Sequence, residues 1–453
     1  MNLFDDYLNK YYIGHRMEQT KHIYIIRYDR LLQNLIKGLL LLLPFSIPID
    51  FGNHQLEIPN EPLLIMTSFI GLIYAYREQV WKLPFFRHPL FLASSAYIGW
   101  TLVTTLFSNH FYVSVKYVLV GSVHWWVYFC LAGIIFSKTK PEDSKIELFY
   151  IFSFISVLLL AWFRHGQYGF SFDTSVFVAR PFYFDHALYS CAALLLLGFS
   201  LPYWWQKKAP YLWFFRTASL FLLLGVYFSY SRAAWLSMIG AFFLTIIIAC
   251  FKPHFKTFLV VVVSLVSIVG FVVFLLISKK ENQVLSKQGS SWQHLQSTIN
   301  VSTDVSNLER LDRYSCAWRM FKTKPVLGYG PGNFIIDYYP FQKEDEMTRL
   351  SVRNHGKHRP GKGGGAHSEY LQALSEMGFI GLLAWLVLIL TMIYTVVQIN
   401  IKSSSPSTRL IVLGLLFGLL TFFIHSLFNN LFHHEKVSAL VWLALATLVH
   451  KKW

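Results

Sequence analysis

A histidine that follows three glycines is the first candidate for chemistry in this sequence. His367 lies in GGGAHSEYLQALSEMGFIGLL, residues 363–383, just before a short helix that Gly378 is expected to end. The positive end of the helix dipole opposes an imidazolium there and favours the neutral ring, which can act as a general base. A lone histidine at a helix start is also typical of a cap or a surface residue, so that interpretation stays open.

Two arginines are unusual because each lies at an expected outer helix end, where a positive charge has no topological purpose. Arg180 is in VARPFYFDHALYS, and Arg232 is in SYSRAAW. A guanidinium binds two phosphate oxygens at once, so a pair of arginines at helix ends suits a diphosphate. Alternatively, they reach lipid headgroups or pair with Asp185 or Asp173.

A metal site is disfavoured by the same residues. His355, His358, His367 and Glu369 could be read as zinc ligands, but their spacing fits no standard zinc motif and no cysteine lies among them. The acidic residues of the region are scattered among lysines and arginines, whereas hard cations need several converging oxygens. We therefore expect no metal and no other cofactor, with arginine taking the electrostatic role of a cation.

The composition indicates a membrane protein. The 453 residues are 54% hydrophobic and 14% charged, against about 25% charged residues in soluble domains, and the mean hydropathy is +0.43. The net charge of +16 is explained by lysines and arginines on cytoplasmic loops, so we infer no nucleic-acid partner. The four cysteines stand singly, and no cleavable signal peptide is apparent, so the first membrane helix should act as the insertion signal.

The apolar runs predict an all-α polytopic membrane protein with about twelve transmembrane helices. Residues 212–251 are too long for one span and must turn back at SYSRAAW, residues 229–235. The predicted spans are 31–49, 62–76, 88–107, 117–136, 148–163, 187–205, the two halves of 212–251, 257–277, 377–401, 410–428 and 433–450.

The distribution of positive charge predicts that both termini are cytoplasmic. The short loops assigned to the outer side hold few positive residues: Arg164, Arg180, Arg232 and Lys436, with Lys116 just inside a span. The chain then divides into residues 1–277 (N-terminus and spans one to nine), a large periplasmic loop domain at 278–378, and residues 379–453 (the last three spans).

The large loop is predicted to be mainly helical. Ser306 and Glu309 have the spacing of a capping box at the start of an amphipathic helix. The apolar face of this helix is expected to consist of Leu311, Tyr314, Trp318 and Phe321. KPVLGYGPGNF follows as a structural turn, because it lacks the Lys-Ser/Thr pair of a phosphate-binding loop.

Four linked motifs in this topology resemble the O-antigen ligase/polymerase superfamily of bacterial inner-membrane enzymes, which use undecaprenyl-diphosphate-linked glycans. They are the Arg180 loop, the SRAAW turn with Arg232, the segment from Arg310 to KPVLGYGPGNF, and HSEYLQALSEMGFIG from His367. The family often has Asn directly after the histidine, where this chain has Ser368.

The resemblance implies a metal-independent, inverting glycosyltransferase. Arg180 and Arg232 would bind the diphosphate of the donor with assistance from Arg310, and His367 would be the general base for the acceptor hydroxyl. Supporting residues would come from the helix after the histidine: Glu369, Tyr370 and Glu376. The acceptor would be the lipid A core, as in an O-antigen ligase.

Other functions remain open at this point. A polymerase, which adds to another glycan repeat, or a protein O-oligosaccharyltransferase would share these motifs. A transporter or flippase would also have many spans, but it should show repeat symmetry and broken helices at mid-membrane, and no motif here has a second copy.

Overall fold

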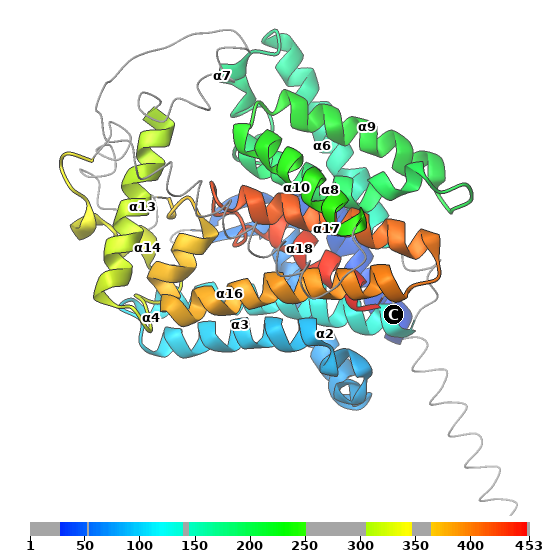
Figure 1. Cartoon of the computed structure of the whole chain (residues 1–453), viewed down its shortest axis with the longest axis horizontal. Coiled ribbons are helices and arrows are strands. Elements are labelled where there is room, and N and C mark those ends of the chain that lie inside the picture. The colour runs from blue at the N-terminus through cyan, green and yellow to red at the C-terminus, as the bar shows by residue number, and fades with distance from the viewer. Residues whose placement is uncertain (1–27, 52–53, 139–144, 251–304, 347–363, 451–453) are drawn as a thin grey trace, which may run out of the picture.

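The computed structural model describes residues 28–51, 54–138, 145–250, 305–346 and 364–450, which form a mainly helical bundle (Figure 1). The helices of the first part are residues 28–42, α2 (Asn60–Arg77), α3 (Pro89–Leu106), α4 (Phe111–His124), α5 (Ala132–Lys138), α6 (Glu147–Gln167), α7 (Phe172–Ser175) and α8 (His186–Ser200). The later helices are α9 (Leu212–Phe228), α10 (Arg232–Cys250), α13 (Val305–Thr323), α14 (Phe334–Asp337), α16 (Glu369–Lys402), α17 (Pro406–His425) and α18 (Glu435–His450).

Most predicted spans coincide with helices. Every predicted span overlaps a helix except 257–277, which lies outside the described residues. The described helices that are long and apolar enough to cross a bilayer are Pro89–Leu106, Phe111–Lys138, Glu147–Gln167, His186–Trp204, Arg232–Ala249, Glu369–Lys402 and Pro406–His425. The chain is therefore a multi-pass membrane protein, and the number of twelve spans stays a prediction.

The turn predicted inside the longest apolar run is confirmed. α9 ends at Phe228 and α10 begins at Arg232, so residues 229–231 reverse the chain. Tyr230 has a positive φ of 53°, and its hydroxyl donates to the Phe170 carbonyl. These contacts hold the reversal against the end of α6.

The structure is mainly helical, as predicted, but a two-stranded antiparallel hairpin that the sequence did not predict follows the first helix. Strands β1 (Ile47–Phe51) and β2 (His54–Ile58) pair with Ile47 opposite Ile58. The first predicted span, 31–49, was therefore too long. Pro44 and Pro48 explain this, because a proline inside a helix removes a backbone donor and clashes with the preceding turn.

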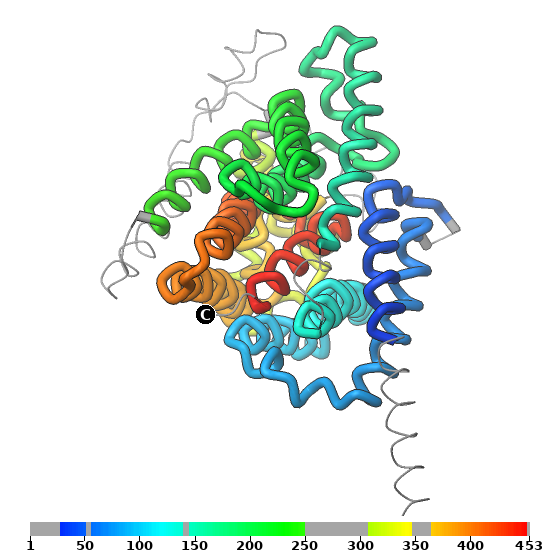
Figure 2. The backbone as a smooth tube through the Cα atoms, turned by 90° about the vertical axis from the view of Figure 1, so that its right-hand side faces the viewer, coloured from blue at the N-terminus to red at the C-terminus, as the bar shows by residue number. Residues whose placement is uncertain are grey.

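Helix α18 lies at the centre of the bundle, as Figure 2 shows with several helices viewed nearly end-on. Nearly all of its side chains are buried. Beside it, α8 and α17 approach each other through small residues: a Cβ at Gly198 would lie 2.7 Å from both the Gly414 carbonyl oxygen and the Gly418 Cα. Such close backbone contact is a common way to pack membrane helices.

Beyond one end of the bundle lie α13 and α14 (Figure 1), which belong to the large loop. The turn around KPVLGYGPGNF docks on a break in α16. Gly378 has φ +68°, the Phe379 amide donates to the Pro325 carbonyl (2.8 Å), and the Gly330 amide donates to the Glu376 carbonyl (2.8 Å). The predicted helix end at Gly378 is thus confirmed, although the domain limits 278 and 378 stay predictions.

Two details predicted for α13 are wrong. The helix already includes Ser306, so this residue is not its cap, and Glu309 bonds to Arg313 instead. The buried face also differs: Trp318 is exposed, whereas α13 buries Asp312, Arg313, Tyr314, Cys316, Ala317 and Met320. Asp312 and Arg313 are buried although they are charged, because their side chains find partners inside the protein. A pattern of apolar residues cannot reveal such partners.

Candidate active site

The backbone of His367 is hydrogen-bonded on both sides to other segments of the chain. Its N–H donates to Oδ1 of Asn430 (3.2 Å), and its carbonyl accepts from the Tyr314 hydroxyl (3.2 Å). It has a positive φ of 55°, and Ser368 caps α16 by accepting from the Leu371 amide. The predicted position at a helix start is therefore confirmed.

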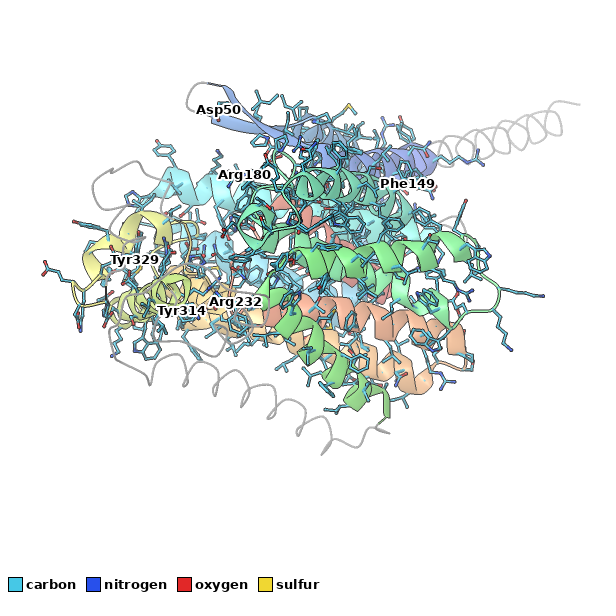
Figure 3. All side chains as sticks on the ribbon, turned by 90° about the horizontal axis from the view of Figure 1, so that it is seen from above. Asp50, Phe149, Arg180, Arg232, Tyr314 and Tyr329 are labelled. Atoms are coloured by element: carbon cyan, nitrogen blue, oxygen red, sulfur yellow. The ribbon has the colours of Figure 1, made fainter. Side chains whose placement is uncertain are left out.

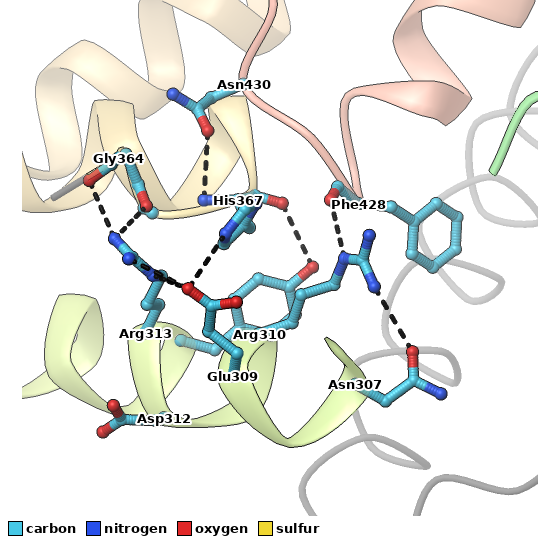
Figure 4. A network of polar contacts seen from close by, with 12 residues as sticks. Asn307, Glu309, Arg310, Asp312, Arg313, Gly364, His367, Phe428 and Asn430 are labelled. Atoms are coloured by element: carbon cyan, nitrogen blue, oxygen red, sulfur yellow. Dashed lines mark hydrogen bonds and ion pairs between the residues drawn. The ribbon is translucent and has the colours of Figure 1, made fainter. Parts of the chain in front are cut away.

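A carboxylate faces the ring of this histidine. Oε1 of Glu309 lies 3.9 Å from Nε2 of His367 and accepts two hydrogen bonds from Arg313, at 3.0 and 3.3 Å (Figure 4). Burial alone would raise the pKa of Glu309, but the contacts with His367 and Arg313 lower it to about 2. Glu309 is thus an anion at neutral pH.

The ring itself is held in the neutral form. Burial is the main cause that lowers the pKa of His367 below its ordinary value; Glu309 raises it, and the charges of Arg313 and Arg310 lower it. A neutral imidazole beside a carboxylate is the arrangement of a general base with an orienting partner.

Arg313 ties the glycine-rich segment to α13. Its side chain is 2% exposed, and its Nη1 donates to the carbonyls of Gly364 (2.8 Å) and Gly365 (3.0 Å). Gly365 is packed so closely that a Cβ would lie 2.5 Å from Oε1 of Gln372 and would also collide with the Asn430 amide. A side chain at this position would have to displace the amides of Asn430 and Gln372, which hold the segment in place.

Arg310, which directly follows Glu309 in α13, also lies at this site, as Figure 4 shows. Its Nε donates to the Phe428 carbonyl (3.2 Å), and its Nη1 donates to Oδ1 of Asn307 (3.4 Å). The structure thus places Arg310 and His367, two of the predicted site residues, next to each other.

Arg180 and Arg232 lie at the same end of the bundle as Tyr314 and Tyr329, as the view in Figure 3 shows. Arg180 is exposed, and its Nε donates to the Phe184 carbonyl (2.9 Å). Arg232 is half-buried at the first position of α10. That their guanidinium groups converge on one cavity stays a prediction.

The side chains of the three predicted supporting residues make hydrogen bonds to backbone groups of neighbouring segments. Oε1 of Glu369 accepts from the Phe432 amide (2.7 Å), and the Tyr370 hydroxyl donates to the Phe423 carbonyl (2.9 Å). Oε1 of Glu376 accepts from the Phe334 amide (2.9 Å). Each of them joins α16 to a neighbouring segment.

Residues 426–434, which we call the C-terminal connection because they join α17 to α18, were missed by sequence reasoning. Besides Asn430 and Phe428, the connection supplies the Ser426 carbonyl for the Glu369 amide (2.9 Å) and the Leu427 carbonyl for the Tyr314 hydroxyl (2.6 Å). A signal was present, since two asparagines interrupt an otherwise apolar hairpin. Glu309 and Arg313 also had a signal in their i, i+4 spacing.

The described residues contain no group of three or more His, Cys, Asp or Glu side chains that could hold a metal ion. His355 and His358, the other members of the zinc alternative, lie outside the described residues. The chemistry that this site offers is proton abstraction by a neutral imidazole beside guanidinium groups, which stabilise developing negative charge.

One family model matches the chain. The model is described as O-Antigen ligase, and it matches residues 217–386. The match therefore contains Arg232, Arg310 and His367, together with Glu309 and Arg313, and it stops short of Arg180 and of the C-terminal connection. No curated protein matches the chain.

Proposed function

Because residues 217–386 match the family model described as O-Antigen ligase, we propose that this protein transfers a glycan from undecaprenyl diphosphate to an acceptor hydroxyl. The reaction takes place at the outer face of the bacterial inner membrane, and the acceptor is the lipid A core. The observation that carries the proposal is the pair of His367 and Glu309 next to Arg310, inside the matched segment.

The base is Nδ1 of His367 in this mechanism. The Glu309 carboxylate faces Nε2 and favours the tautomer with its proton there, which leaves the Nδ1 lone pair to take the acceptor proton. As that proton moves to Nδ1, the acceptor oxygen bonds to the anomeric carbon. The bond from this carbon to the phosphate oxygen breaks, and its electron pair leaves with undecaprenyl diphosphate.

The arginines stabilise the leaving group. Arg180, Arg232 and Arg310 bind the diphosphate, whose negative charge grows as the sugar–phosphate bond breaks, and fixed guanidinium groups stabilise such charge without reorganisation. Attack from the face opposite the diphosphate inverts the anomeric centre. The imidazolium that forms is stabilised by Glu309, since this carboxylate has a pKa of about 2.

The test is transfer by the purified full-length protein. It is incubated with an undecaprenyl-diphosphate-linked glycan and with lipid A core, a second copy of the lipid-linked glycan, or an acceptor protein. Glycan on the lipid A core supports the ligase. Glycan on the second lipid-linked unit would make the protein a polymerase, and glycan on the protein an oligosaccharyltransferase. No transfer to any of the three contradicts the proposal.

A further inference from the structure

A buried lysine lies against the loop that carries Arg180. Lys436 is the second residue of α18 and is 5% exposed. Its Nζ donates to the Ser46 carbonyl (2.7 Å) and to the Phe182 carbonyl, and it lies 4.9 Å from the centre of the Tyr183 ring. Phe182 and Tyr183 follow Arg180 by two and three residues.

The backbone of Lys436 contacts the same loop through a tyrosine. Its carbonyl accepts from the Tyr150 hydroxyl (2.8 Å), which lies 3.2 Å from the Tyr183 hydroxyl. Phe182 also packs edge-to-face on Phe45, next to Ser46. Lys436 therefore joins α18, the turn before β1 and the Arg180 loop.

The Arg180 loop depends on such contacts because it has no regular structure between α7 and α8. The Arg180 carbonyl accepts from Nη1 of Arg164, and Nε of Arg180 donates to the Phe184 carbonyl. Among the described residues, the latter is the one hydrogen bond that the Arg180 guanidinium makes. The direction of the Arg180 side chain is thus set by the backbone of residues 182–184, and Lys436 donates to this backbone at the Phe182 carbonyl.

We infer that Lys436 is a positioning residue for donor binding: its ammonium fixes the loop that aims Arg180 at the diphosphate. This inference rests on the proposed function and on the diphosphate role of Arg180. The lysine does not touch the donor itself. A lysine suits this place because its ammonium can donate to two carbonyls at once.

The experiment compares two lysines that each lie over a tyrosine ring. Lys436→Met keeps the side-chain length and removes the donors. Lys138→Met is the matched control, since Lys138 lies 4.8 Å from the centre of the Tyr74 ring at the end of α5. In transfer assays with full-length protein, Lys436→Met should raise the donor KM about tenfold, because a misdirected Arg180 would lose about one charged hydrogen bond to the diphosphate. The acceptor KM should stay unchanged. The control should change neither value.

A double-mutant cycle with Arg180→Ala separates positioning from general damage. If Lys436 acts through Arg180, adding Lys436→Met to Arg180→Ala should raise the donor KM no further. Multiplied effects in the double variant, or equal changes in both KM values, would overturn the inference. If Lys436→Met does not fold, Lys436→Gln, which can donate to one carbonyl, should give a smaller rise in donor KM, and an unchanged value contradicts the inference.

The cycle also distinguishes this inference from the proposed function. A wild-type protein that transfers no glycan contradicts the function itself. A normal donor KM for Arg180→Ala removes the diphosphate role of Arg180 and the inference with it. A raised donor KM for Arg180→Ala beside a normal one for Lys436→Met leaves the proposed function standing and overturns only the inference.

Discussion

The ring of His367 has an anion on one side and guanidinium groups around it. Glu309 faces Nε2, while Arg310 and Arg313 lie close enough to lower the pKa of the ring. A base that is neutral when the acceptor arrives, and is stabilised once it has taken a proton, needs both kinds of neighbour. Three predictions concern this histidine and the arginines proposed to bind the diphosphate.

His367→Ala should lower the transfer rate by about 10²- to 10⁴-fold, the usual contribution of a general base. The ring contacts Glu309, whereas the segment around it is held through backbone atoms by Asn430 and Tyr314. The variant should therefore be inserted and purified like the wild type. Near-normal transfer by this variant removes His367 from the mechanism.

The pH profile of transfer should follow the lowered pKa of His367. The active form is the neutral ring, so the rate should persist at pH 6.5 and fall only as the pH drops through the lower pKa of the folded protein. Glu309→Gln removes a contact that raises this pKa, so the acidic limb should move to still lower pH, with a reduced maximal rate. A limb that moves to higher pH would argue against this pairing.

Arg180→Lys and Arg232→Lys should each raise the donor KM about tenfold to a hundredfold, because an ammonium keeps the charge but cannot bind two phosphate oxygens as a guanidinium does. Arg77→Lys, at the last residue of α2, is the control and should behave like the wild type. Normal donor KM values for both lysine variants would contradict the proposed diphosphate site.

At the scale of elements, the site is a junction of α13, the start of α16 and the C-terminal connection. Asn430 reaches the His367 amide, Phe428 reaches Arg310, and Arg313 reaches the carbonyls of the glycine segment. Only α13 and α16 carry residues that the sequence marks for chemistry. The connection contributes mostly backbone carbonyls, so its amino-acid types say little about its role.

Gly365→Ala should lower transfer about a hundredfold, because a misplacement of about 1 Å can have that effect on a catalytic group. The added methyl would push on the amides of Asn430 and Gln372, which bond to the backbone of His367 and Ala366. Gly99→Ala in α3 is the matched control, since its Cβ would meet nothing within 4 Å. Equal rates for the two variants contradict the proposed tight fit.

Sequence reasoning succeeded where a feature depends on a few neighbouring residues. The reversal before Arg232 followed from a run too long for one span, and the break at Gly378 from the local change in polarity. It failed for Glu309, which was read as part of a capping box, because His367, which its carboxylate faces, lies far along the chain. It also failed for the hairpin at Ile47–Ile58, because the apolar residues 47–49 at the start of β1 resemble the end of a membrane helix.

At the scale of the whole molecule, two carboxylates among the described residues 305–346 have cationic or imidazole partners. Glu346 pairs with Arg319, and Oδ1 of Asp337 lies 3.0 Å from Nε2 of His110. Carboxylates held by cationic or polar partners are poor ligands for a hard cation, which needs several of them at one point.

Transfer should therefore persist in EDTA at the rate measured without it, with guanidinium groups in the role of the cation. The assay is run with purified protein before and after dialysis against chelator. If the rate falls and added magnesium or manganese restores it, the electrostatic role has been assigned to the wrong residues.

The place of the C-terminal connection also has a consequence for biosynthesis. A ribosome makes Arg180, Arg232, Arg310 and His367 before it makes residues 426–436, which supply Asn430 to the histidine and Lys436 to the Arg180 loop. A nascent chain therefore contains His367 and the Arg180 loop before the residues that contact them have been made. Under the proposed function, glycan transfer therefore waits for the synthesis and insertion of α18, which follows these reactive residues in the chain.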